Sequence, residues 1–140
     1  MNALFIFLLI VFLHIIADFN LQGILSSLKQ KRFWIRKNIE KECFEICSAK
    51  TFALEHKYRF DYWVALFIHS FIWIFIVMLP IAFKMSFNIN FTFILLFIFN
   101  LIIHMIVDDL KANKLKISLL EDQGVHLLQL LNIFIFYINI

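Results

Sequence analysis

Four long apolar runs constrain the fold of this 140-residue chain more than any other feature. They cover residues 3–19, 62–83, 91–110 and 117–138. A helix needs about 20 apolar residues to cross the roughly 30 Å of hydrocarbon in a bilayer. Charged residues make up only 16% of the chain, whereas a soluble domain has about a quarter. The sequence therefore predicts an all-α, polytopic membrane protein, with residues 1–140 forming a single domain of four transmembrane helices.

The first run could also be taken for a cleaved signal peptide. Signal peptides begin with a basic region and end at a cleavage site formed by small residues. This run has neither, and it ends in a histidine and a carboxylate, His14 and Asp18. We therefore interpret residues 3–19 as a helix that is retained.

The distribution of lysine and arginine predicts the orientation in the membrane. Of the 13 basic residues, twelve lie between the first and second runs or between the third and fourth, and only Lys84 lies between the second and third. Cytoplasmic loops of membrane proteins carry an excess of these residues. We expect a multi-pass protein of the inner cell membrane with both termini on the non-cytoplasmic side.

The linker between the first two predicted spans, residues 24–59, mixes basic and apolar side chains and contains no proline or glycine. This pattern favours amphipathic helices that lie on an anionic lipid surface through residues 29–59. A helical hairpin that binds a protein partner is the alternative. Cys43 and Cys47 are interpreted as ordinary reduced thiols rather than as a metal site or lipid anchor, and His56 as an interfacial residue.

Three His/Asp pairs lie at the ends of apolar runs that face the cytoplasm in this orientation. They are His14 and Asp18, His104 and Asp108, and Asp122 and His126. Residues four apart share one face of an α-helix. His69 lies about 12 Å along the second helix from Asp61, at 1.5 Å per residue. We expect these seven side chains to form one layer in the inner half of the bilayer.

Such a layer has a structural and a functional interpretation. Each pair could join helices by hydrogen bonds alone. A carboxylate in the middle of a membrane costs about 2.5–3.5 kcal/mol on insertion scales. Because three pairs and an additional histidine recur at one depth, we favour a functional site.

Two functions fit this layer. Imidazole and carboxylate ligands suit zinc, manganese or iron, and seven candidate ligands exceed the four of a structural zinc site. They could hold two metals about 3.5–4 Å apart, which activate water for attack on phosphate esters. The other function is a proton or ion pathway, which the lack of ionisable groups in the outer half of the spans disfavours.

The sequence predicts a role for each polar residue of the layer. The predicted metal ligands are His14, Asp18, His69, His104, Asp108, Asp122 and His126. Asp18, Asp108 and Asp122 are also candidate catalytic residues, since one carboxylate could act as a general base, and Lys111 could hold an anionic substrate group. The side chains expected to orient the ligands are Gln22, Asn100, Gln123 and Gln129.

The motifs HIIADFNLQ (14–22), IH (68–69), HMIVDDLK (104–111) and EDQGVHLLQL (121–130) resemble the domain-of-unknown-function family numbered 3307. That family contains small bacterial and phage-borne integral membrane proteins, and the resemblance covers nearly the whole chain except the linker. It marks His14, Asp18, Phe19, Gln22, His69, His104, Asp108, Lys111, Asp122, Gln123 and His126. A weaker similarity is to small membrane-bound metal-dependent hydrolases.

The sequence thus predicts a metal-dependent hydrolase at the cytoplasmic face of the membrane. Its substrate would be a phosphate-bearing lipid or nucleotide-like molecule, and its cofactor a divalent zinc, manganese or iron ion. The alternative is a non-enzymatic transport or ion-binding component, assembled as a homo-oligomer. We expect the lipid bilayer as a partner and no nucleic acid.

Overall fold

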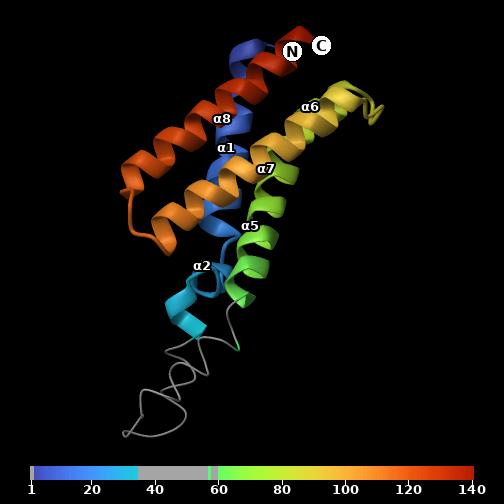
Figure 1. The fold of residues 1–140 in the computed structure, drawn as a ribbon. Coiled ribbons are helices and arrows are strands. Elements are labelled where there is room, and N and C mark those ends of the chain that lie inside the picture. The colour runs from blue at the N-terminus through green and yellow to red at the C-terminus, as the bar shows by residue number, and fades with distance from the viewer. Residues whose placement is uncertain (1, 35–56, 58–59) are drawn as a thin grey trace, which may run out of the picture.

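The computed structural model describes residues 2–34, 57 and 60–140, and every regular element among them is a helix (Figure 1). In chain order these are α1 (Ala3–Ile15), the π-helix η1 (Ile16–Asn20), α2 (Leu25–Leu28), α5 (Asp61–Val77), α6 (Leu79–Lys84), α7 (Phe91–Ala112) and α8 (Leu119–Asn139). The predicted all-α class is confirmed for these residues.

Polar side chains cap the N-termini of three of these helices. Asn2 accepts a hydrogen bond from the N–H of Leu4 at the start of α1, and Asn90 accepts one from the N–H of Phe93 at the start of α7. Ser118 begins α8 with a capping box. Because a helix leaves its first N–H groups without internal partners, such caps fix where it begins.

The second apolar run differs from the single span predicted over residues 62–83. α5 ends at Val77 and α6 begins at Leu79, with Met78 between them. Pro80 stands in the first turn of α6, where its missing N–H cannot bond to the preceding turn. The run therefore forms two helices rather than one.

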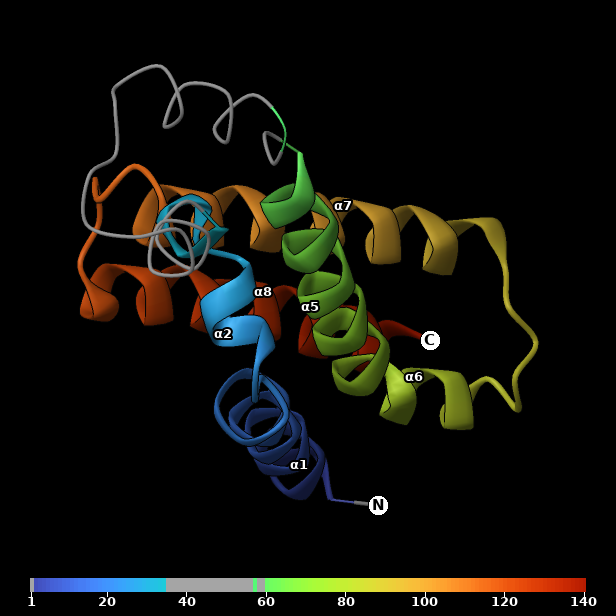
Figure 2. The same cartoon turned by 90° about the horizontal axis from the view of Figure 1, so that it is seen from below.

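The four longest helices pack in a closed ring. α1 contacts α5 and α8, and α7 contacts the same two helices. α7 and α8 lie side by side in both views (Figures 1 and 2). The chain termini lie at one end of this bundle and α2 lies at the other (Figure 1). The ring thus gives residues from distant parts of the sequence one shared interior.

That interior is apolar toward the termini and polar toward α2. The buried apolar cluster contains Ile6, Ile10, Trp73, Ile74, Val77, Leu130 and Ile133, among others. In α1 these residues precede the first histidine, and in α8 they follow the last one. The polar part of the interior therefore occupies the half of the bundle nearer α2.

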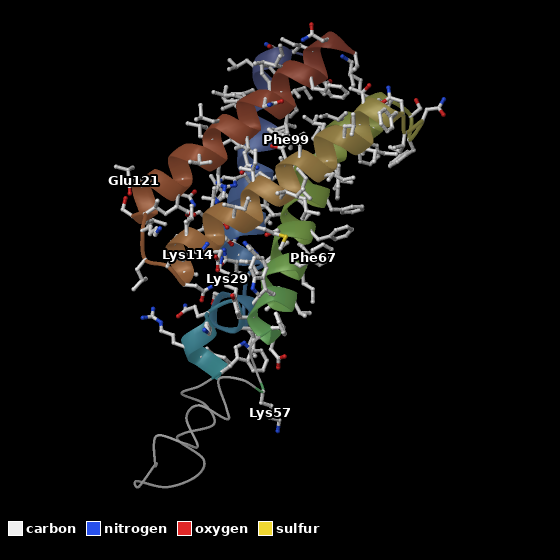
Figure 3. The ribbon with its side chains drawn as sticks, viewed as in Figure 1. Lys29, Lys57, Phe67, Phe99, Lys114 and Glu121 are labelled. Atoms are coloured by element: carbon white, nitrogen blue, oxygen red, sulfur yellow. The ribbon has the colours of Figure 1, made fainter. Side chains whose placement is uncertain are left out.

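The outer surface is unusually apolar for a protein with so polar an interior. Phe67 and Phe99 are 46% and 53% exposed (Figure 3). The buried polar side chains are His14, Asp18, Lys29, His69, Ser70, Asn100, His104, Asp108, Asp109, Asp122, His126 and Gln129. Charged side chains are almost never fully buried in soluble domains unless they are paired, and large exposed apolar patches mark contact with a membrane or a partner.

Among the described residues, two helical segments are long and apolar enough to cross a membrane, namely Ala3–Asn20 and Phe91–Ala112. α5 is apolar but has only 17 residues. α8 has 21 residues, but polar side chains such as Asp122 and His126 interrupt its first half. The structure therefore bears out the helical class, and two of the four predicted spans are helical segments that could cross a membrane.

The linker predicted over residues 24–59 is described only at residues 24–34 and 57. α2 and Lys29 belong to this part and turn toward the bundle. The predicted amphipathic helices fall mostly outside the described residues, as do Cys43, Cys47 and His56.

Candidate metal centre

Four different parts of the chain deliver His and Asp side chains to the polar half of the bundle. Asp18 comes from η1 and His69 from α5, whereas α7 and α8 each supply one pair. These residues, Asp18, His69, His104, Asp108, Asp122 and His126, are all at most 4% exposed. The structure therefore brings together six of the seven side chains that were predicted to ligate metal.

The first group of potential ligands consists of Asp18, His69, His104 and Asp108, each offering one atom within 4.8 Å of the others. The Nε2 atom of His69 lies at its centre. This atom is 3.4 Å from Asp18 Oδ1, 3.2 Å from Asp108 Oδ2 and 3.3 Å from His104 Nε2. Buried His and Asp side chains in this arrangement could hold a metal ion.

The second group consists of Asp18, Asp122 and His126, again within 4.8 Å of one another. His126 Nε2 is 3.4 Å from Asp122 Oδ1 and 3.9 Å from Asp108 Oδ1. Asp18 belongs to both groups, and Asp108 directs one oxygen toward each. The two groups are thus joined through the carboxylates of Asp18 and Asp108.

The separations within the groups fit coordination better than direct hydrogen bonding. Charge-assisted N–H···O bonds are about 2.7–2.9 Å long, whereas the His–Asp contacts here span 3.2–3.9 Å. Two ligand atoms about 2.1 Å from one ion at a tetrahedral angle lie about 3.4 Å apart. The space between these atoms therefore has the dimensions of a cation site.

The hydrogen bonds of His126 leave one of its nitrogens available to a cation. Gln129 donates through Nε2 to the carbonyl of Asn100 at 2.9 Å, so its Oε1 must accept the proton of His126 Nδ1 at 3.0 Å. In the neutral ring Nε2 then carries a lone pair that faces two carboxylates. This arrangement is repulsive unless Nε2 is itself protonated or a metal cation lies between the three atoms.

Several buried atoms of the cluster have no hydrogen-bond partner within the part of the chain that the structure describes. They are His104 Nδ1, Asp108 Oδ1, Asp122 Oδ1 and His126 Nε2. Leaving a buried donor or acceptor unsatisfied costs about 1–3 kcal/mol, and more for charged groups. Three of these atoms form a group, because Asp108 Oδ1 and Asp122 Oδ1 lie 3.9 and 3.4 Å from His126 Nε2. One cation placed between them would satisfy all three.

His14 lies beside the cluster but in neither ligand group found among the described residues. Trp73 donates an indole N–H to its Nδ1 at 2.8 Å, so Nε2 carries the proton and donates to Gln123 Oε1 at 3.1 Å. Both ring nitrogens are therefore engaged. In this arrangement His14 orients Gln123 instead of offering a free nitrogen to a metal.

Four amide side chains hold the cluster, as the sequence suggested. Gln123 donates to Asp18 Oδ2 at 2.9 Å and to Asp122 Oδ2 at 3.1 Å. Gln22 donates to the other oxygen of Asp18 at 2.8 Å. Asn100 and Gln129 form the chain of bonds behind His126. These contacts fix the directions in which the carboxylates and imidazoles point.

Two lysines neutralise part of the charge. Lys111 bonds to Asp122 Oδ2, and Lys29 Nζ lies 2.7 Å from Asp108 Oδ2 with its side chain only 8% exposed. Figure 3 shows Lys29 where the segment after α2 approaches the bundle. Sequence analysis placed Lys29 among the linker cations, because nothing local distinguishes it from the other basic residues there.

Trp73 is the other residue of the site that sequence analysis missed. Its fully buried indole stacks on His104, with ring centroids 4.2 Å apart and planes 20° apart. A signal was present, because Trp73 follows His69 by four residues and so shares its helix face. Its N–H donates a hydrogen bond to His14, so its role goes beyond apolar packing.

No protein-family model, curated protein or solved structure matches this chain. The resemblance to the domain-of-unknown-function family numbered 3307 therefore stays a prediction, and the function has to be argued from the site itself.

Proposed function

We propose that this chain is a metal-dependent hydrolase that acts on phosphate-bearing substrates at a membrane surface. The observation that carries the proposal is the pair of His/Asp groups that share Asp18. Two ligand groups with a common carboxylate are the arrangement expected around two neighbouring divalent ions. Ordinary hydrogen bonding between helices would not leave so many of their atoms without partners.

The residues present suit this chemistry. A pair of divalent ions supplies an activated water and charge stabilisation for in-line attack on a phosphorus atom. Zinc, manganese and iron all accept imidazole and carboxylate ligands. The residues that would hold the ions are Asp18, His69, His104, Asp108, Asp122 and His126. One carboxylate oxygen not used as a ligand would take the proton of the attacking water.

The proposal includes the membrane arrangement. α5 with α6, and α8, would complete a four-span bundle beside the two apolar segments, and the basic loops would place the cluster near the cytoplasm. Residues 29–59 would contact anionic lipid. The apolar outer surface supports this arrangement, because bilayer-facing positions are apolar and ionisable residues face the bundle interior. Membership of the family numbered 3307 is part of the same proposal.

Cysteine labelling tests the topology. In a variant whose Cys43 and Cys47 are replaced by serine, single cysteines at Ser27 and at Asn88 should react from opposite sides of the membrane, with Ser27 cytoplasmic. The reason is that twelve of the 13 basic residues lie within the two loops assigned to the cytoplasm. Labelling by a membrane-impermeant maleimide, before and after permeabilisation, gives the result. Reaction of both positions from one side would contradict the four-span arrangement.

Phosphate release tests the hydrolase. The full chain in nanodiscs, supplied with manganese, should release phosphate from phosphatidic acid or from a nucleoside monophosphate, and Asp18→Asn should lower the rate by about 100-fold or more. Residues that merely orient a metal ligand are already worth about 10–100-fold, and Asp18 belongs to both groups. Asp61→Asn is the matched control, because Asp61 lies at the start of α5 outside the cluster.

The same assay also distinguishes the hydrolase from the alternative, a non-enzymatic ion-binding or transport component. A wild type that binds manganese stoichiometrically yet hydrolyses neither substrate would be an ion-binding or transport component. Equal rates in wild type and Asp18→Asn would remove the cluster from the reaction altogether.

A further inference from the structure

A pocket of about 300 Å³ opens beside the cluster, between the segment that follows η1 and the end of α7. Its lining includes three cationic side chains, Lys29, Arg32 and Lys111, together with the amide of Gln22. Asp108 also lines it and is only 1% exposed, so this carboxylate lies at the inner end. We term this space the basic pocket.

The wall of the basic pocket is fixed by hydrogen bonds between distant segments. Asn113, which ends α7, accepts a hydrogen bond from the N–H of Lys31 at 2.7 Å and donates to the carbonyl of Lys29 at 3.1 Å. These two bonds hold the backbone around Lys29 against α7. A lysine that emerges from so firmly held a backbone has a defined reach, and its ammonium group can move only through its own side-chain torsions.

The two lysines contact one carboxylate of each ligand group. Lys29 lies on Asp108 of the first group, and Lys111 lies on Asp122 of the second. An ammonium group and a metal ion need the same carboxylate lone pairs. Divalent cations entering the groups would therefore compete with both lysines, and each lysine already lines the basic pocket into which it would turn.

Charge balance favours this exchange. Two divalent cations, held by neutral histidines, would carry one positive charge more than the carboxylates of Asp18, Asp108 and Asp122 can neutralise. Both lysines would then be repelled from the carboxylates that they contact. A lysine side chain is flexible and presents three donors, so the released groups, with Arg32, would make the basic pocket attractive to an anion.

We propose that the basic pocket binds the phosphate group of the substrate, and that Lys29 and Lys111 turn from the carboxylates to this phosphate when divalent cations enter. This inference rests on the metal centre of the proposed function. Lysine and arginine recognise phosphate through charge-assisted hydrogen bonds. The shared ligand chemistry is a phosphate dianion, carried either by a soluble ester or by a lipid headgroup.

Lys29→Met tests the exchange through two opposite effects. In the full chain in nanodiscs, the variant should bind manganese at least as tightly as wild type, because no ammonium competes for Asp108. It should bind inorganic phosphate, in the presence of manganese, about tenfold more weakly, which is the scale of one lost charge-assisted hydrogen bond. Isothermal titration with manganese alone, and then with phosphate, measures both affinities. A merely structural role for Lys29 would weaken both.

Two further variants keep the test decisive. Lys111→Met should have the same two effects, unchanged or tighter manganese binding and weaker phosphate binding. It carries little risk to the fold, because this side chain is 31% exposed. Lys116→Met is the matched control, because Lys116 is exposed outside the basic pocket, and it should change neither affinity. In wild type, manganese should raise the affinity for phosphate at least about tenfold, and phosphate should raise that for manganese by the same factor.

The outcomes separate the two proposals. A wild type that binds no manganese overturns the metal centre, and the exchange with it. If wild type binds manganese, but its affinity for phosphate is changed neither by manganese nor by Lys29→Met, only the exchange is overturned.

A competition arm identifies the source of the phosphate. Phosphatidic acid in the nanodisc should lower the apparent affinity for inorganic phosphate, relative to phosphatidylcholine, if the pocket takes a lipid headgroup. Equal affinities in both lipids, with displacement of phosphate by a soluble nucleoside monophosphate, assign it to soluble esters. Displacement by neither would overturn the inference.

Discussion

Replacing His104 and Asp108 together by leucine should remove the bound metal and make the thermal stability of the protein insensitive to chelators. The pair supplies two of the four ligands in the first group, and Asp108 also faces the second. A bound ion stabilises only the state that holds it, by about 2.7 kcal/mol at a concentration 100 times its dissociation constant. Wild type should therefore lose stability when a chelator is added, whereas the double variant should not respond.

This double replacement also distinguishes a metal centre from polar contacts between helices. If the pair only joined helices, apolar residues of similar size would be neutral or stabilising, because they avoid the desolvation of buried charge. Metal analysis of the purified protein and melting curves with and without chelator provide the measurements. A metal-free wild type that ignores the chelator and tolerates the replacement would show that the layer is structural.

Trp73→Ala should destabilise the protein by about 3–5 kcal/mol, the range found when a large buried aromatic side chain is truncated. Trp73 is fully buried, stacks on His104 and donates its N–H to His14. Its removal would leave a cavity between the apolar and polar halves of the interior and an unsatisfied nitrogen on His14. Unfolding in mixed micelles, followed by helical circular dichroism, measures the loss.

Trp63→Ala is the matched control for this prediction. Trp63 lies on the same helix, α5, but is 40% exposed, and exposed positions usually change stability by less than about 0.5 kcal/mol. Trp73→Phe separates the contributions, because it retains most of the packing and removes only the hydrogen bond, which is worth about 1–3 kcal/mol when a buried partner is left unsatisfied. Similar losses for Trp73→Ala and Trp63→Ala would contradict the packing role assigned to Trp73.

The sequence was sufficient to predict the all-α class, the long helices α7 and α8 and most of the cluster, because the physical signals were strong. Long uncharged runs specify helices in an apolar environment, and buried carboxylates must find partners. Residues four apart do share a face in α7 and α8, where His104 is 3.9 Å from Asp108 and His126 is 3.4 Å from Asp122. The convergence of these pairs follows from that spacing.

The first pair differs from the other two in its backbone, which is not α-helical at Asp18. Residues Ile16–Asn20 form a π-helix, closed by a hydrogen bond from the N–H of Leu21 to the carbonyl of Ile16. Asp18, within this turn, contacts Gln22 and His69, whereas His14, in the preceding α1, contacts Trp73; both residues also bond to Gln123. Local π-turns often occur at functional sites, but spacing alone does not reveal them.

Lys29 illustrates a different limit of sequence reasoning. Its position depends on tertiary contacts with Asn113 and Asp108, which lie about 80 residues further along the chain. Counting charges treats all linker cations alike, because nothing in their local sequence distinguishes one from another. The inward position of Lys29 becomes visible only in the three-dimensional arrangement around the end of α7.

The residues of the cluster are also synthesised at different times. Asp18 and Gln123, which are hydrogen-bonded, are separated by 105 positions. A ribosome that adds about 5–20 residues per second needs roughly 5–20 seconds to cover that interval. During this time Asp18, in η1, lacks its partners on α8, which have not yet been synthesised. Because α8 follows α1, α5 and α7 in the chain, translation speed sets how long the nascent chain carries this charge before the bundle can close.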